Sequence, residues 1–258
     1  MAQIYHFFIL FLLSISIAES ADPTGEFCNK ATKIKRPQIS SNIKSLLSIL
    51  VSGTTKNGFT ISSYGQAEDQ VFGLAQCRGD VSQEDCSICI QDAAKEITKR
   101  CTNEADARIW YDYCFLRYNT NKFLGQVDTS YGIFYWNVNN VTGVEDFNKS
   151  LGNLVDEVSS QAVKNGNKGL GKGKKKLSDF LTLYALVQCT RDLEPLSCAQ
   201  CLAIAVGNFP TYCDNKQGCR VFYSSCSLRY ELYPFYFPLD AQNTKQDAQV
   251  KYHIVSKA

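Results

Sequence analysis

The sequence predicts an α+β protein made of two tandem disulfide-stapled domains, each with helices packed on an antiparallel sheet. The prediction rests on an apolar N-terminal run, a high cysteine content and an internal repeat. A secreted chain meets an oxidising environment, in which closely spaced cysteines pair. The twelve cysteines of this chain are therefore expected to form structural bridges.

The N-terminal segment 1–20 is predicted to be a signal peptide. Its apolar run, FFILFLLSISIA at residues 7–18, is too short to span a bilayer, and small residues follow it. We expect cleavage near Ser20 or Ala21 and a mature chain that is released rather than anchored in a membrane. With 27 basic and 25 acidic residues, the charge is nearly balanced, which does not favour nucleic acid as a partner.

An internal repeat sets the domain count. The stretch CRGDVSQEDCSIC at residues 77–89 recurs as CTRDLEPLSCAQC at residues 189–201, a constant offset of 112. Pairs that keep this offset include Cys77/Cys189, Cys86/Cys198, Cys89/Cys201, Cys101/Cys213, Cys114/Cys226, Gln76/Gln188, Arg108/Arg220 and Arg117/Arg229. Such a period is the size of a small domain and too long for a solenoid unit. We predict domains at residues 23–126 and 132–237, followed by a C-terminal tail at 238–258.

The cysteine spacing has three possible meanings. A zinc site is disfavoured because the mature chain has a single histidine, His253, and because each CxxC has further cysteines on both sides. A redox CxxC is disfavoured because the cysteines are dense and even in number. Structural bridges remain. Parity assigns the cysteine private to each copy to the same shared position, giving Cys28–Cys101 and Cys213–Cys219, although six cysteines alone permit fifteen connectivities.

Local patterns predict the elements. Ser40 or Ser41 is expected to cap a helix through IKSLLSILVS, and Ser82 a second helix through QEDCSICIQDAAKEITKRC. ARIWYDYCFLRYN, residues 107–119, is aromatic and β-branched and favours strand. Copy two repeats the plan with VEDFNKSLGNLVDEVSSQAV, LSCAQCLAIAVGNF and CRVFYSSCSLRYELYPFYF. Asn140 and Asn148 begin glycosylation sequons.

Two further stretches have a plain and a functional interpretation. NGNKGLGKGKKK, residues 165–176, holds six lysines and no acid when it is counted from Lys164. We expect a mobile solvated loop there; the alternative is a contact for an anionic polysaccharide or a membrane surface. Arg78-Gly79-Asp80 matches an adhesion tripeptide, but it lies within a staple loop and copy two reads Thr-Arg-Asp, which indicates chance.

The repeated CX8CX2C pattern, the leading Cys-Asn and the closing segments RYNTNKF and RYELYPF resemble the plant cysteine-rich repeat secretory proteins with two ginkbilobin-type (DUF26) domains. The resemblance covers roughly residues 26–237. It implies two helices on a five-stranded antiparallel sheet in each domain, and a role in defence in the apoplast. The implied bridges are Cys28–Cys101, Cys77–Cys86, Cys89–Cys114, Cys189–Cys198, Cys201–Cys226 and Cys213–Cys219.

The same resemblance implies a mannose site of an antifungal lectin, built from an Asn, an Arg and a Glu. In copy one the matching positions are Asn29, Arg108 and Asn119, so the carboxylate is missing; copy two keeps Arg220 and Glu231 but lacks the Asn. On one unbroken strand, Arg108 and Asn119 would face opposite sides, so convergence needs a bend or two strands. The alternative is that both arginines only tie the sheet together by salt bridges.

Catalysis is not expected, because one histidine and no free thiol leave no obvious triad or nucleophile. No cofactor, metal or catalytic residue is predicted. Two binding functions remain open. One is a lectin-like binder of mannose-type glycans, and the other is a module that engages receptor or microbial proteins.

Overall fold

The structure is a computed structural model and describes residues 22–238 and 250–257. The predicted signal peptide, residues 1–20, and most of the predicted C-terminal tail lie outside the described residues. Within the described ranges, no helix is both long and apolar enough to cross a membrane.

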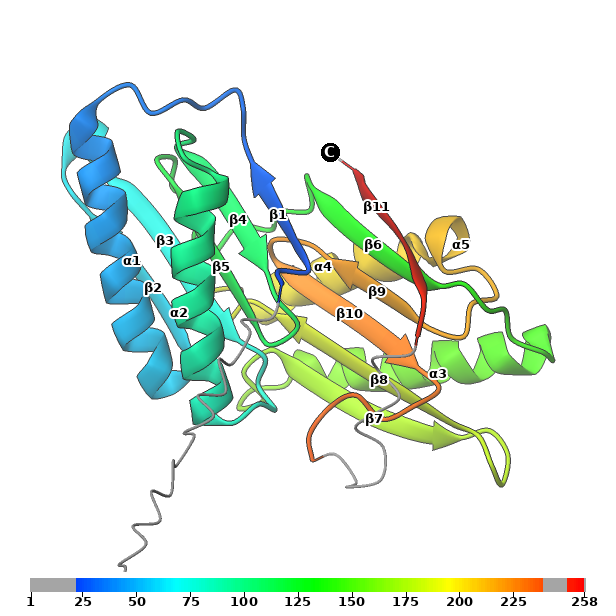
Figure 1. The fold of residues 1–258 in the computed structure, drawn as a ribbon. Helices are drawn as coiled ribbons and strands as arrows, with labels where there is room; N and C mark the ends of the chain where they lie inside the picture. The colour runs from blue at the N-terminus through cyan, green and yellow to red at the C-terminus, as the bar shows by residue number, and fades with distance from the viewer. Residues whose placement is uncertain (1–21, 239–249, 258) are drawn as a thin grey trace, which may run out of the picture.

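The N-terminal domain has two helices on one face of a five-stranded antiparallel sheet (Figure 1). Its strand order is β1-β4-β5-β3-β2. The elements are β1 (Gly25–Cys28), α1 (Pro37–Asn57), β2 (Phe59–Tyr64), a 3-10 turn η1 (Ala67–Asp69), β3 (Val71–Cys77), α2 (Gln83–Arg100), β4 (Asp106–Trp110) and β5 (Cys114–Asn119).

The C-terminal domain repeats this plan and adds a strand. Its sheet order is β11-β6-β9-β10-β8-β7, and helices α3 and α4 cover one face. The elements are β6 (Gly132–Asn137), α3 (Val144–Ala162), β7 (Leu170–Lys176), β8 (Thr182–Cys189), α4 (Pro195–Gly207), α5 (Phe209–Tyr212), β9 (Cys219–Phe222), β10 (Cys226–Glu231) and β11 (Tyr252–Lys257).

The α+β class with antiparallel sheets is confirmed, with one correction. Strands β6-β9-β10-β8-β7 of the second sheet have the same order as β1-β4-β5-β3-β2 of the first, as expected for a tandem repeat. The second sheet has six strands rather than five, because residues 252–257 of the predicted tail pair with β6 as β11. This added edge strand has no counterpart in the N-terminal domain.

Helix starts follow local capping chemistry. The Oγ of Ser82 accepts a hydrogen bond from the backbone N–H of Asp85 at 3.0 Å, as predicted for the start of α2. The start predicted for the first helix at Ser40 or Ser41 is wrong, since α1 begins at Pro37. Proline suits the first helical position, where its missing N–H costs no intrahelical bond. Leu46 and Leu50 of α1 are fully buried against the sheet.

The lysine-rich stretch predicted to be a loop is largely a strand. Residues 170–176 form β7, the outer strand beside β8. Lysine and glycine are depleted in strands, which is why the composition misleads. The glycines have a packing role, because a Cβ on Gly171 would lie 1.8 Å from the carbonyl oxygen of Val158 in α3. Only glycine permits this approach of helix and strand.

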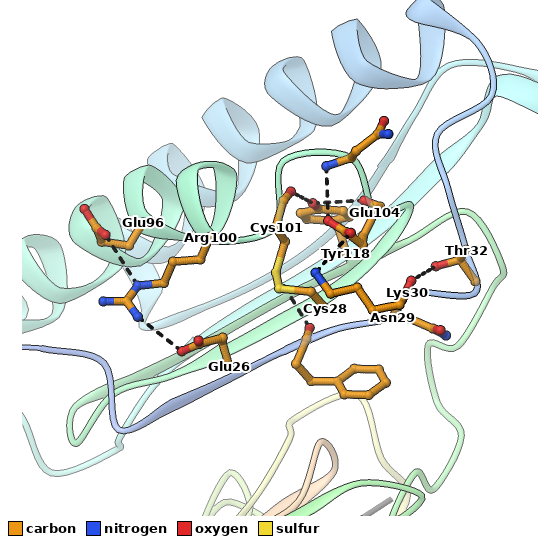
Figure 2. The surroundings of a disulfide bond; sticks show 12 residues. Glu26, Cys28, Asn29, Lys30, Thr32, Glu96, Arg100, Cys101, Glu104 and Tyr118 are labelled. Atoms are coloured by element: carbon orange, nitrogen blue, oxygen red, sulfur yellow. Dashed lines mark hydrogen bonds and ion pairs between the residues drawn. A yellow bond between two sulfur atoms is a disulfide. The ribbon is translucent and has the colours of Figure 1, made fainter.

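All twelve cysteines are bridged, so none has a free thiol. The six pairs are the same pairs that the family resemblance implies: Cys28–Cys101, Cys77–Cys86, Cys89–Cys114, Cys189–Cys198, Cys201–Cys226 and Cys213–Cys219. Every bridge lies within one domain. The Cys28–Cys101 bridge joins β1 to the end of α2, where Arg100 also pairs with Glu26 (Figure 2).

A buried carboxylate holds the segment that follows this bridge. Glu104 is 3 % exposed, and its Oε1 accepts hydrogen bonds from Lys33 Nζ at 2.7 Å and Lys30 Nζ at 3.3 Å. Its Oε2 accepts one from the backbone N–H of Asn103 (Figure 2). The hydrogen bond from Lys33, against the opposing effect of burial, lowers the pKa of Glu104 from 4.5 to about 2.

Glu104 is therefore expected to make stability acid-sensitive. A carboxyl whose pKa is depressed by folding stabilises the protein fully above the unfolded pKa and loses this contribution as pH falls through the folded pKa. The free energy of unfolding of the native chain should exceed that of Glu104→Gln at pH 6, and the difference should shrink between about pH 4.5 and about pH 2. Urea titrations of both proteins across this range test it; a constant difference would contradict it.

Candidate functional site

The predicted sugar residue Arg108 belongs to a buried charge cluster in the N-terminal domain. Arg108 on β4 and Arg117 on β5 are partners in the strand register and lie on the face away from the helices. Asp128, from the segment between the domains, places its Oδ2 3.2 Å from Arg108 Nη2 and 2.7 Å from Arg117 Nη2. Both arginines are 4 % exposed. We call these three residues the first arginine centre.

The charges of this centre stabilise one another. Burial alone would raise the pKa of Asp128, but the positive charges of Arg108 and Arg117 outweigh it and lower the pKa overall. Burial lowers the pKa of Arg117 to about 10, and the like charge of Arg108 adds to this effect. Phe123 stacks 3.9 Å from the guanidinium of Arg117, and Phe27 lies 4.9 Å from that of Arg108. The centre is thus covered by rings as well as neutralised.

The other two predicted sugar residues of copy one lie beside this centre. The Nδ2 of Asn29 donates to Asp106 Oδ2 at 3.1 Å, and the same oxygen lies 3.5 Å from Arg108 Nη2. Asn119 pairs with Asp106 in the register of β5 and β4, so two adjacent strands carry Arg108 and Asn119 and the two residues share a face. The Oδ1 of Asn119 accepts from the backbone of Asn121 at 2.8 Å.

The C-terminal domain holds a matching second arginine centre. Arg220 on β9 pairs in register with Arg229 on β10, and both lie near Glu231. The Oε1 of Glu231 is 2.9 Å from Arg229 Nε and 3.5 Å from Arg220 Nε. Glu231 is fully buried. In each domain, two arginines therefore share one carboxylate. Arg108 and Arg117 are equivalent in the repeat to Arg220 and Arg229, whereas the shared carboxylates come from non-equivalent positions.

The added strand β11 closes the second arginine centre. The hydroxyl of Tyr252 donates to Glu231 Oε1 at 2.6 Å and lies 2.5 Å from the hydroxyl of Tyr233. Its ring lies 4.6 Å from the guanidinium of Arg220. Burial raises the pKa of Tyr252, and the charge of Glu231 adds to this, so the hydroxyl stays protonated and can donate. Side chains of this chain thus fill the positions around both predicted sugar arginines.

Arg108 and Arg220 also form hydrogen bonds with the other domain. Arg108 Nη1 donates to Ser224 Oγ at 2.7 Å, and Arg220 Nη1 donates to Asp112 Oδ1 at 3.0 Å. Asp112 and Ser224 are equivalent in the repeat, so the two contacts are related by a pseudo-two-fold axis. Burial and the like charge of Arg229 would lower the pKa of Arg220, but Asp112, Tyr252 and Glu231 raise it overall. The two arginines thus also connect the sheets of the two domains.

Two equivalent glutamines form the middle of this boundary. Gln76 Nε2 donates to the carbonyl of Cys189 at 2.9 Å, and Gln188 Nε2 donates to the carbonyl of Cys77 at 3.3 Å. In return, Gln76 Oε1 accepts from the N–H of Arg191, and Gln188 Oε1 accepts from the N–H of Gly79. Both glutamines are buried. The domains therefore meet through a reciprocal polar contact in which each amide group both donates and accepts a hydrogen bond.

The tripeptide Arg78-Gly79-Asp80 lies at the same boundary. Arg78 Nε pairs with Asp80 Oδ1 at 2.6 Å, and the Asp80 side chain is fully buried. Asp80 Oδ2 also accepts from the N–H of Phe237 in the other domain. These internal contacts give the tripeptide a structural role and keep its carboxylate from an external partner.

Sequence reasoning missed several residues of the two centres. Arg117 and Arg229 could have been found from the sequence, because both are charged residues in a predicted buried strand and they keep the repeat offset of 112. Tyr252 carried no such signal, because its strand has no equivalent in the other copy. Asp112 and Asp128 carried none, because they lie outside the strands and no local pattern predicts their contacts with the arginines. Within residues 22–238 and 250–257, no group of three or more metal-ligating side chains occurs.

Comparisons with known proteins agree with this architecture. A family model described as salt stress response/antifungal matches residues 27–121 and 136–233. The chain is 55 % identical over 241 residues to cysteine-rich repeat secretory protein 55 of Arabidopsis thaliana, covering 91 % of each chain. It is 40 % identical over 229 residues to an antimicrobial ginkbilobin-2-like protein of Castanea crenata, covering 88 % of this chain and 95 % of that one.

A solved structure shows the same two-domain arrangement. The tandem DUF26 ectodomain of the Arabidopsis thaliana cysteine-rich receptor-like protein PDLP8 superposes with a TM-score of 0.71 at 31 % identity. The match covers 81 % of this chain and 97 % of that one. The ectodomain of PDLP5 gives a TM-score of 0.68 at 22 % identity, which supports the fold alone.

Proposed function

Because the chain belongs to the salt stress response/antifungal family, with relatives named as secretory proteins, we propose that it is a secreted, non-enzymatic binding protein of the plant apoplast. It acts in defence or stress responses and engages a protein partner of receptor or microbial origin. The predicted signal peptide at residues 1–20 supports export.

The internal contacts of the two arginine centres favour a protein partner over mannose. When a hydrogen bond to a sugar hydroxyl replaces an existing hydrogen bond within the protein, the net gain in binding free energy is small. Asp128 neutralises Arg108, while Tyr252 and Asp112 engage Glu231 and Arg220. Opening either centre to a sugar would break a buried ion pair, which is costly.

A weakened mannose site remains the second candidate, and one observation favours it. Asn29 is only half-buried and lies next to Asp106 and Arg108, so a polar cluster of the expected composition reaches the surface of the N-terminal domain. The missing carboxylate at Asn119 removes a charge-assisted hydrogen bond, which weakens the site.

A paired titration tests the proposal. We expect no binding of mannose at millimolar concentration by calorimetry, and saturable binding to at least one extracellular receptor domain in a panel, unchanged by added mannose. Asn29→Ala is the matched variant, because this half-exposed side chain can be shortened without opening either arginine centre. Mannose binding in the native chain that disappears in Asn29→Ala would overturn the protein-partner proposal and support the lectin.

Two exposed glycosylation sequons support the same extracellular setting. Asn140 and Asn148 are both exposed, the latter on α3, so both sequons can be reached from solvent. We propose that both carry N-linked glycans. Mass spectrometry of the protein secreted from plant cells should find glycans at both sites and a mature start near residue 21.

A further inference from the structure

The lysine segment, defined as residues 164–176, forms a continuous basic strip along one edge of the C-terminal domain. Its strand β7 is the outer strand of the sheet beside β8 (Figure 1). Successive side chains on a strand alternate between faces, so Lys172, Lys174 and Lys176 share a face at intervals of about 7 Å. Lys164 and Lys168 lie exposed in the turn before the strand.

Most of these lysines are not neutralised by the protein. In the described part of the chain, Lys176 pairs with Asp179 at 2.8 Å, and no other lysine of the segment forms an ion pair. Lys164, Lys168 and Lys174 are exposed. Helix α3 packs against the other face of β7, on the side of Gly171 and Gly173. The chain as a whole is nearly balanced in charge, so this strip concentrates positive charge in one place.

Protection of a sheet edge does not account for the lysines. Natural proteins do place lysine on edge strands to prevent pairing with other chains. However, the equivalent outer strand of the N-terminal domain is β2, with the sequence FTISSY, and it contains no lysine. The same fold therefore has an outer strand without basic residues in the N-terminal domain. Edge protection alone does not explain the lysines of β7.

Two tyrosine rings lie beside the basic strip on the same face. Tyr184 of β8 is the register partner of Lys174. Tyr236 packs against Tyr184 with ring centroids 6.0 Å apart, and Lys172 Nζ lies 5.6 Å from the Tyr236 ring. Both rings are half-buried. Partly exposed tyrosines give apolar faces for the C–H surface of a sugar and hydroxyls at the rim, while the lysines supply positive charge.

We propose that the lysine segment, with Tyr184 and Tyr236, binds an acidic polysaccharide that carries one carboxylate on each sugar. A linear polyanion can contact the whole strip, from the turn lysines to the far end of β7, a span of about 20 Å. A membrane would instead meet the exposed Phe180 at the hairpin tip, near only the last lysines. None of these residues belongs to an arginine centre, so the inference does not depend on the proposed function.

The test measures binding of the full mature chain to polygalacturonate by biolayer interferometry. We expect Lys168→Gln/Lys174→Gln/Lys176→Gln to weaken binding at least tenfold. The control is Lys35→Gln/Lys44→Gln/Lys95→Gln, which makes the same change of charge at exposed positions of the N-terminal domain and should change affinity less than twofold. Fully methyl-esterified polygalacturonate, which keeps the sugar and loses the charge, should not bind.

Three results would overturn the proposal. Equal losses in the two triple variants would show that net charge alone drives binding. Equal binding of the esterified polymer would show that the lysines do not recognise its carboxylates. Binding to vesicles rich in phosphatidylserine without binding to the polymer would assign the strip to a membrane surface.

Discussion

Replacing Glu231 with alanine is expected to destabilise the protein by about 3–5 kcal/mol, because it leaves Arg220 and Arg229 buried without their shared carboxylate. Glu231 is fully buried, so water cannot take its place without opening β11. Urea unfolding followed by tryptophan fluorescence measures the loss. Near-ultraviolet circular dichroism checks that the variant still folds.

The matching change in the other domain gives the control. Asp128→Ala removes a carboxylate that also lies between two arginines, but its side chain is 17 % exposed and solvent can replace part of the interaction. We expect a loss of about 1.5–3 kcal/mol there. Should Glu231→Ala cost less than Asp128→Ala, the second arginine centre would not be the buried structural unit described above.

The second large effect on stability is expected from the one bridge in each domain that has no equivalent in the other domain. Removing Cys28–Cys101 with a pair of serines should cost about 4.5 kcal/mol, and removing Cys213–Cys219 about 2 kcal/mol, in the loop-entropy model. The two bridges close loops with sequence separations of 73 and 6 residues, and a longer loop loses more freedom in the unfolded chain.

Both serine pairs should be compared by the same urea titration, with the Cys77–Cys86 pair as a further reference. That bridge has a separation of 9 residues, so its removal should cost about 2.5 kcal/mol. The order of the three losses is the test. Equal losses for the long and short bridges would mean that native contacts around each disulfide, rather than loop length, set its contribution.

The repeat made the architecture predictable. Because five cysteines keep one offset, a pattern in either copy could be checked against the other, and the strand order of the two sheets agrees. Two of the three errors arose where one copy departs from the other. The composition of β7 predicts a loop, because glycine is depleted in strands, but these glycines allow contact with α3. Residues 252–257 are predicted as a tail because the other domain has no strand equivalent to β11.

The arginine centres show a different limit. The strand alternation and the repeat could place Arg108 and Arg220, but no sequence pattern states that Asp128, from the connecting segment, lies between Arg108 and Arg117. The family resemblance pointed to these positions as sugar contacts. Only the three-dimensional arrangement shows that the chain itself already occupies them, because such contacts join residues from separate segments.

The reciprocal exchange between Gln76 and Gln188 has the symmetry of a homodimer, although both halves belong to one polypeptide. A connecting segment keeps such halves at a high effective concentration, so their association no longer depends on the amount of protein. The two halves nevertheless differ, since the outer strand of one carries lysines and that of the other carries none. A single half produced alone should pair with itself through the same glutamine.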